Sequence, residues 1–127
     1  ELAEKIDALA KQVKDMDNCV FNIHVPPFQS EIDMVPKLDT TTYPPKPIYE
    51  AGAPVMVPVG STAVREAIEK YQPLLGLHGH IHESRGFIEI GRTLVINPGS
   101  EYGEGILRGV MINLEKEKIK GYQFLSG

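Results

Sequence analysis

Histidine is the residue type in this chain that most strongly suggests chemistry. Three of the four histidines, His78, His80 and His82, occupy alternate positions in one short segment. In an extended backbone this spacing places side chains on one side, and imidazole is the commonest metal ligand in proteins. The fourth histidine, His24, lies far upstream and is followed closely by two prolines. We therefore expect metal chemistry that uses both groups of histidines together.

A short loop at a strand end could direct two neighbouring imidazoles to points a few ångströms apart. Two metal ions separated by about 3.5–4 Å would need such an arrangement. Gly79 lies just before His80 and His82 and is expected to let the backbone turn sharply there. The alternative is that these histidines only finish a strand and bond to the backbone. Their alternation beside a glycine, with another histidine at a second strand end, favours metal binding.

Hydrophobic periodicity predicts the elements that position these histidines. Apolar residues recur every three or four positions over residues 2–16, which is typical of an amphipathic helix. Residues 19–23 then suit a buried strand that ends at His24. Ser61 is a good N-cap for a second helix, and residues 74–77 form a second apolar run that leads into the clustered histidines. The repeated order of helix, strand and histidine predicts an α/β layered fold with ligands at the strand ends.

The segment between these two units has a different composition. Residues 25–60 contain eight prolines and show neither a helical nor a strand period. A loop of this length inside a compact domain is usually functional or mobile. We expect an insert within one domain, which covers the site or forms a partner surface and so sets specificity, rather than a linker between two domains.

The C-terminal part of the chain predicts antiparallel strands. Residues 86–90 and 93–96 flank a short Gly-Arg turn and are typical of a β-hairpin. Residues 106–114 and 119–125 flank a charged turn and predict two further strands.

Composition excludes several classes of protein. A chain of 127 residues fits one domain, and its net charge of −4 without any basic stretch does not indicate nucleic-acid binding. No apolar run approaches the ~20 residues needed to span a bilayer, so no membrane association is expected. Cys19 is the only cysteine, which rules out an intrachain disulfide and makes the reducing cytoplasm the expected compartment. Its thiol is expected to be a small buried hydrophobe.

Three short motifs together resemble those of the calcineurin-like metallophosphoesterases. The Gly-His-Ile-His run at 79–82 matches the family's Gly-His-x-His motif. The segment 23–27 is similar to the family's earlier strand-end histidine, which is often followed by proline. The segment 96–100 is similar to the Asn-Pro-Gly-Ser turn of many members. Their order and spacing match over nearly the whole chain apart from the insert at 25–60.

The resemblance implies a fold and a function. The fold would be a layered β-sandwich flanked by helices, with residues 1–127 forming the C-terminal portion of the domain. The function would be hydrolysis of phosphate esters by a hydroxide that bridges two divalent metal ions. These ions could be Mn, Fe, Zn, Ni or Mg, which the motifs do not distinguish.

The resemblance also implies roles for individual residues. His24 and His80 would bind one ion, and His82 would bind the other. His78 and Asn97 would support these ligands without binding an ion themselves. Asn97, together with Ser100, is expected to shape its loop rather than to contact substrate.

Three of the family's motifs are missing from this chain. They are Asp-x-His, a Gly-Asp whose aspartate bridges the metals, and Gly-Asn-His. The chain is therefore expected to be the C-terminal half of the domain, with no catalytic residue of its own and no turnover in isolation. Its expected partners are a phosphate-ester substrate, the missing N-terminal half and, through an exposed sheet edge, a second copy.

Two other functions remain open. The chain could be a non-catalytic scaffold or regulatory fragment with a vestigial or single-metal histidine site, which metal content would reveal. A hydrolase using Ser100 is the weaker alternative, because the sequence around this serine lacks the glycines of a nucleophile elbow.

Overall fold

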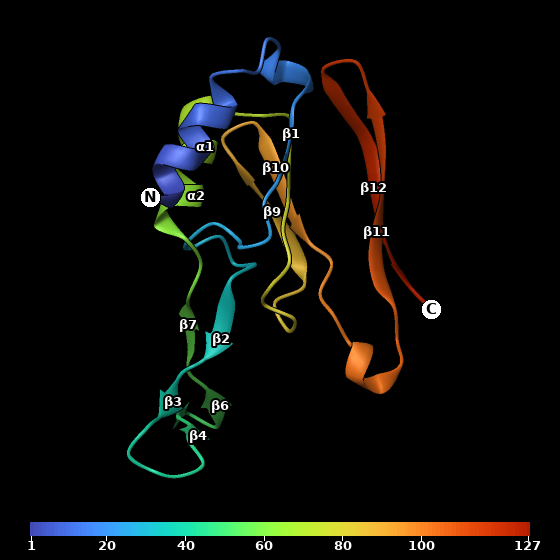
Figure 1. Cartoon of the computed structure of the whole chain (residues 1–127). Helices are drawn as coiled ribbons and strands as arrows, with labels where there is room; N and C mark the ends of the chain where they lie inside the picture. Colours follow the sequence, from blue (N-terminus) through green and yellow to red (C-terminus); the bar gives the residue numbers. More distant parts are fainter.

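A four-stranded sheet forms the body of the molecule, as seen in a computed structural model that describes all residues, 1–127 (Figure 1). The strand order is β1 (Val20–Asn22), β8 (Leu75–Leu77), β10 (Thr93–Asn97) and β9 (Gly86–Ile90). The first three strands run parallel, and β9 is antiparallel to β10. The carboxyl ends of β1, β8 and β10 therefore meet at one edge of the sheet.

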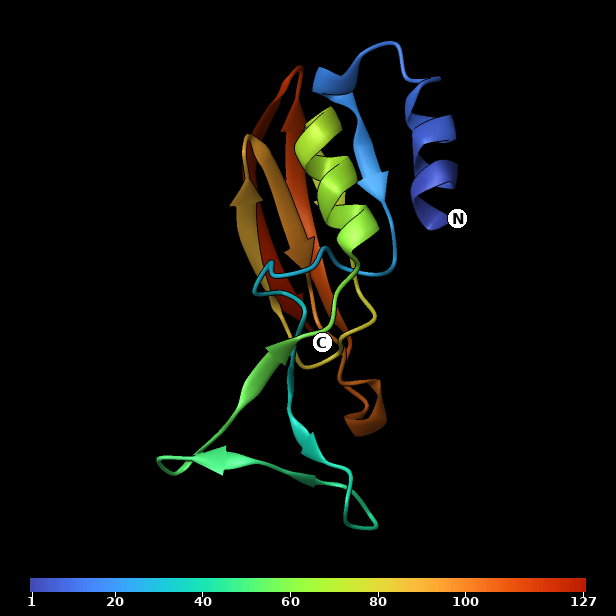
Figure 2. The same ribbon diagram turned by 90° about the vertical axis from the view of Figure 1, so that its left-hand side faces the viewer.

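Two helices, α1 (Leu2–Ala10) and α2 (Thr62–Tyr71), pack on one face of this sheet (Figure 2). The helix α2 begins where expected, because the Ser61 hydroxyl accepts a hydrogen bond from the Val64 amide. The core on this face includes Ile6, Ala10, Phe21, Val64, Ala67, Ile68, Ile90 and Val95. Neither helix has the length and the apolar character that crossing a membrane requires.

The hairpin of β11 (Arg108–Glu115) and β12 (Lys118–Ser126) lies on the opposite face (Figure 1). Side chains alternate between the two faces of a strand. Accordingly, Val95 of β10 packs with the helix-side core, whereas Leu94 and Ile96 pack toward the hairpin. The hairpin residues that cover them are Val110, Ile112, Ile119 and Phe124.

Residues 34–58 form an arm that extends away from the body (Figures 1 and 2). The arm contains three antiparallel strand pairs: β2 (Met34–Pro36) with β7 (Met56–Pro58), β3 (Leu38–Asp39) with β4 (Lys46–Pro47), and β5 (Tyr49–Glu50) with β6 (Ala53–Pro54). The expectation that this insert lacks strands was wrong. Both strands of a two-stranded pair are edge strands. Prolines are tolerated in them because the outward-facing amides have no partner strand to bond.

The predicted layered β-sandwich flanked by helices is also wrong. The twelve strands divide among five separate sheets, and four of these sheets have only two strands. Frequent prolines limit the strands of the arm to two or three residues. The C-terminal hairpin pairs only with itself and so adds no strand to the central sheet.

The first helix is shorter than periodicity predicted. It ends at Ala10, and Met16–Asn18 form a 3-10 turn instead of a last helical turn. The Asp15 carboxylate stabilises this turn by accepting hydrogen bonds from the Asp17 amide and the Asn18 side chain. The side chain of an aspartate can bond nearby backbone amides in place of the carbonyl oxygens of a helix, which favours a turn over further helix.

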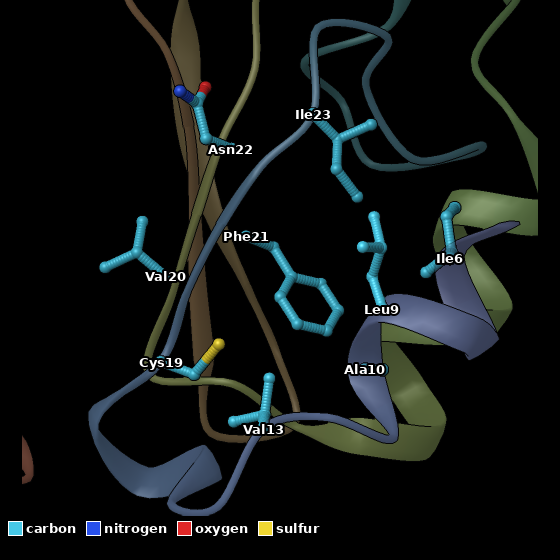
Figure 3. A pocket seen from close by; sticks show the side chains of 9 residues that line it. All are labelled: Ile6, Leu9, Ala10, Val13, Cys19, Val20, Phe21, Asn22 and Ile23. Carbon is cyan, nitrogen blue, oxygen red and sulfur yellow. The ribbon is translucent and has the colours of Figure 1, made fainter.

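An apolar pocket of about 210 Å³ opens between α1 and the outer strand β1 (Figure 3). Leu9 and Val20 border it and are exposed to 69% and 37% of their surface. Cys19 also lines the pocket, and burial raises the pKa of its thiol. A raised pKa keeps the thiol neutral and poorly nucleophilic at pH 7, although Cys19 is only partly buried and not fully buried as predicted.

Candidate functional site

His24 and His80 lie together although 56 positions separate them in the sequence. They follow β1 and β8, which are parallel neighbours, so both rings lie at the same edge of the sheet. The ring centres are 5.4 Å apart, with an angle of 74° between the ring planes. Two imidazoles bound tetrahedrally to one Zn²⁺ at about 2.1 Å would have ring centres about 5 Å apart. The observed separation therefore allows the two rings to share one ion.

Hydrogen bonds fasten the two histidine segments to each other. The Gly79 amide donates to the carbonyl oxygen of His24 at 2.8 Å. The ring Nδ1 of His78 lies 2.8 Å from the Ile23 oxygen and 3.2 Å from the Val25 oxygen. Because both neighbours are acceptors, Nδ1 carries the proton and donates. The backbone on each side of His24 is thus held by the segment that carries His80.

His80, not Gly79, makes the sharp turn. His80 has a φ of 65°, and the Ile81 amide donates to the Gly79 oxygen across it at 2.7 Å. Such a turn is rare for a residue with a side chain, and a left-handed conformation of this kind costs about 1–3 kcal/mol. The expectation that Gly79 supplies the turn was wrong. Its missing side chain instead leaves room for the ring of His24, which a Cβ would meet at 3.3 Å.

His82 lies in different surroundings from the other two predicted ligands. Its ring packs edge-on against Tyr102, with 5.6 Å between ring centres. It lines a pocket of about 460 Å³ that has no hydrophobic residue in its wall. No group of three or more His, Cys, Asp or Glu residues is close enough to hold a metal ion. The structure thus brings together His24 and His80 and leaves His82 apart from them.

The polar pocket beside His82 carries charges of both signs. Its other lining residues are Glu83, Arg85, Ser100, Glu101, Glu104 and Arg108. Arg108 forms an ion pair with Glu101. Arg85 forms no ion pair, and its guanidinium lies over the ring of Phe124 at 4.7 Å. Arg85 is therefore the cation in this pocket that has no carboxylate partner.

His78 is buried, with 5% of its surface exposed. Its Nε2 has no hydrogen-bond partner, and a Cβ on Gly76 would lie 2.7 Å from it. Burial lowers the pKa of this imidazole below its usual range, although the two carbonyl acceptors oppose the shift. A ring enclosed in this way holds the backbone around His24 and is not accessible to an ion from solvent.

The lowered pKa of His78 predicts acid sensitivity. The folded protein resists protonating this ring, so the unfolded chain binds more protons below about pH 6.5. The free energy of unfolding should therefore fall as the pH drops from 6.5 toward the lower folded pKa, and this contribution should level off below it. Urea unfolding at several pH values in a chelator should show the fall. The variant H78N, which keeps a donor but cannot titrate, should lack it, and an unchanged slope would contradict the prediction.

Asn97 lies at the end of β10 with 1% of its surface exposed. Its side-chain amide donates to the carbonyl oxygens of Ile81 at 2.9 Å and Ile32 at 3.2 Å. Its oxygen accepts from the Gly99 amide at 2.9 Å. Asn97 thereby touches the turn between the clustered histidines, because Ile81 lies between His80 and His82.

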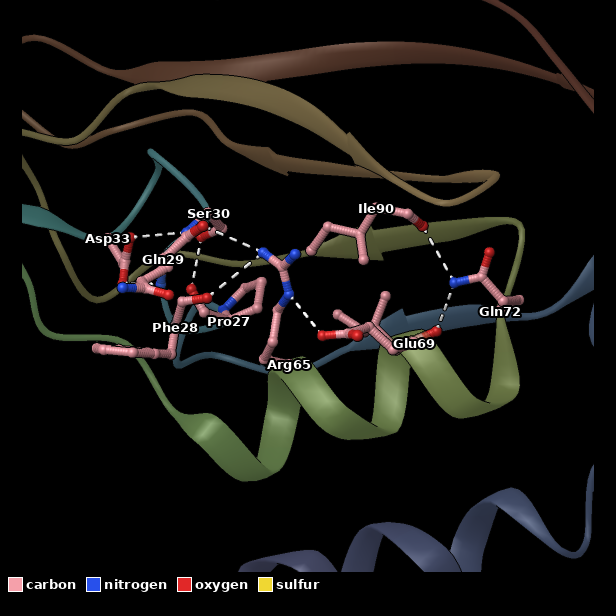
Figure 4. Close-up of polar contacts among 10 residues, drawn as sticks. Pro27, Phe28, Gln29, Ser30, Asp33, Arg65, Glu69, Gln72 and Ile90 are labelled. Atoms are coloured by element: carbon pink, nitrogen blue, oxygen red, sulfur yellow. Dashed lines mark hydrogen bonds and ion pairs between the residues drawn. The ribbon is translucent and has the colours of Figure 1, made fainter.

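Sequence reasoning missed the residues that anchor the arm to the site. Asp33 is fully buried, and its carboxylate accepts hydrogen bonds from the amides of Gln29, Ser30 and Gly60 at 2.9, 3.1 and 2.9 Å (Figure 4 shows its neighbours). The one available signal was a lone acid between two apolar residues. Arg65 of α2 reinforces this region by donating to the Gln29 oxygen at 3.1 Å.

Ser84 connects residues 31–34, the base of the arm, to the loop that carries the histidines. Its hydroxyl donates to the Glu31 oxygen at 3.1 Å and accepts from the Met34 amide at 3.0 Å. The arm and the histidine loop are therefore joined by side-chain hydrogen bonds between residues about 50 positions apart in the sequence.

Comparison with known proteins shows a relative of similar sequence. An uncharacterised protein of Methanocaldococcus jannaschii is 34% identical over 97 residues, which make up 75% of this chain and 37% of that protein. The chain thus spans little more than a third of the length of this relative. No protein-family model matches the chain. No solved structure matches it either.

Proposed function

We propose that this chain belongs to a metal-dependent phosphoesterase, in which His24 and His80 bind one divalent ion and His82 contributes to a second. The close approach of His24 and His80 at one sheet edge, 5.4 Å between ring centres, is the observation on which the proposal depends. The motifs at 79–82 and 96–100, which resemble those of calcineurin-like metallophosphoesterases, give the reaction class.

The donor set fits one ion better than two. Imidazole nitrogens suit Zn²⁺, Ni²⁺ or Cu²⁺, and His24 and His80 offer two of them. Two dications held close together need anionic ligands between them, and no carboxylate joins these histidines. A two-metal centre therefore does not fit this chain alone. Its carboxylates would have to come from another segment of the intact protein or from another chain, and the isolated chain should not turn over.

The residues of this chain would bind and orient the reactants. Divalent ions at this edge would polarise the phosphate and lower the pKa of water. The polar pocket beside His82 would receive the ester, and the unpaired guanidinium of Arg85 would contact phosphate oxygens. Ser84 and Asn97 keep the base of the arm against the histidine loop, so the arm would border the substrate's approach.

Zinc titration of the isolated chain tests the ligand assignment. We expect one Zn²⁺ per chain by isothermal titration calorimetry. Either H24A or H80A should weaken binding at least 10-fold, because each removes one of only two ligands. The matched control is H82A, which removes an imidazole outside the pair and should change the affinity by less than about 2-fold. Equal losses in all three variants, or no zinc binding by the wild type, would contradict the assignment.

A non-catalytic role is the second candidate function. It is favoured by the lack of any group of three metal donors in the chain. A scaffold or regulatory fragment could keep one structural ion on His24 and His80, or none, with the other histidines vestigial. An intact protein that binds a single ion and shows no metal-stimulated hydrolysis of any phosphate ester would support this role.

A further inference from the structure

We propose that Asn97 is the positioning residue that keeps the ring of His80 facing His24. It would bind neither the ion nor the substrate and would act through the backbone. Of the three readouts given below, only zinc affinity depends on the metal site of the proposed function. Its physical basis is the unusual backbone of His80 and the number of groups that one buried amide fixes.

The turn at His80 is held by its surroundings. A φ of 65° is unfavourable for a histidine, and a three-residue turn has only one hydrogen bond of its own, from the Ile81 amide to the Gly79 oxygen. At the end of the turn, the Ile81 carbonyl oxygen accepts hydrogen bonds from the Ser84 amide at 3.2 Å and from the Asn97 side chain at 2.9 Å. At its start, the turn is also held by the Gly79 amide, which donates to the His24 oxygen at 2.8 Å. At its end, the bond from Asn97 is the one that ties the Ile81 oxygen to the sheet.

Asn97 is itself held on three sides. It ends the fully buried strand β10, and its side-chain oxygen accepts from the Gly99 amide. Its side-chain amide donates a second hydrogen bond to the carbonyl oxygen of Ile32, at the base of the arm. A carboxamide supplies two donors and an acceptor at one point, which neither an aspartate nor a serine can do. This side chain thus connects the sheet, the base of the arm and the His80 turn.

The experiment compares two substitutions with a neighbouring control. N97S can keep the bond to the Gly99 amide, and N97D keeps the acceptor and the shape, but both lose the bonds to Ile81 and Ile32. S84A removes two other, partly buried hydrogen bonds, and the backbone amide of residue 84 can still donate to the Ile81 oxygen. The control therefore loosens the same region without releasing the turn from the sheet.

Two readouts do not need metal. In the wild type and in S84A, the ring protons of His24 and His80 should give a nuclear Overhauser effect. In N97S and N97D this effect should be lost, and the Ile81 amide should exchange with solvent at least 10-fold faster relative to amides of the central sheet. Retention of both signals in either Asn97 variant would overturn the proposal.

Zinc affinity gives the third readout. Loss of a residue that orients a ligand typically lowers metal affinity 10- to 100-fold. We expect this loss in the Asn97 variants and a change below about 2-fold in S84A, and the reverse order would overturn the proposal. A wild type that binds no zinc would contradict the proposed function and leave the two metal-free readouts to decide the role of Asn97.

Hydrogen exchange of the wild type tests the proposal without any substitution. The carboxamide protons of Asn97 and the amide proton of Ile81 should exchange with solvent through the same opening event. Their exchange rates should therefore rise equally with urea concentration. If the Ile81 amide exchanged through a smaller opening while the Asn97 carboxamide stayed protected, the two groups would be uncoupled and the proposal would be wrong.

Discussion

Replacing His80 by alanine in the intact protein should lower turnover of phosphate esters at least 100-fold. The substitution removes one of the two imidazoles whose ring centres lie 5.4 Å apart, so the ion that they would share loses one of its ligands. A 100-fold loss corresponds to about 2.7 kcal/mol of transition-state stabilisation. The measurement is metal-dependent hydrolysis of p-nitrophenyl phosphate and of bis(p-nitrophenyl) phosphate.

A suitable control for H80A is K116A, since Lys116 is exposed in the turn between β11 and β12, which lies near Asn18 at the sheet edge opposite the histidines. Its turnover should stay within about 2-fold of the wild type. Circular dichroism should show that H80A is folded. Folded H80A that keeps more than a tenth of the wild-type rate would show that His80 is not a ligand in the reaction.

Replacing Asp33 by alanine should lower the free energy of unfolding by about 3–5 kcal/mol. The Asp33 carboxylate is fully buried and accepts from three backbone amides, which would lose their acceptor together. An amide that loses its acceptor costs about 1–3 kcal/mol when it is buried, and here one buried and two partly buried amides lose theirs. Urea unfolding at pH 7, followed by circular dichroism, measures the change.

The matched control for D33A is D39A. Asp39 also accepts two short hydrogen bonds, from the amide and hydroxyl of Thr41, but these lie in the exposed arm. D39A should therefore lower the free energy of unfolding by no more than about 1 kcal/mol. Similar losses in D33A and D39A would show that burial of the Asp33 carboxylate is not what matters.

The sequence predicted well those elements whose pattern is local. The second helix, the strand before the clustered histidines and the hairpin over 86–97 appear at or within a residue or two of their expected bounds. Each of them has an N-cap, a proline or a glycine turn that marks its ends, together with a regular apolar period. Long-range pairing has no such local signal. The strand pairs of the arm and the division into five sheets were therefore not foreseen.

By itself, the sequence determined that histidines follow two buried strands, because strand periodicity and the flanking turns are properties of neighbouring residues. Only the tertiary structure decided which histidines meet. The parallel pairing of β1 with β8 brings His24 to His80, and the left-handed backbone of His80 carries the chain onward so that His82 faces Tyr102. Both depend on contacts between residues far apart in the chain, among them the bond from Asn97 to Ile81, and no local pattern encodes these.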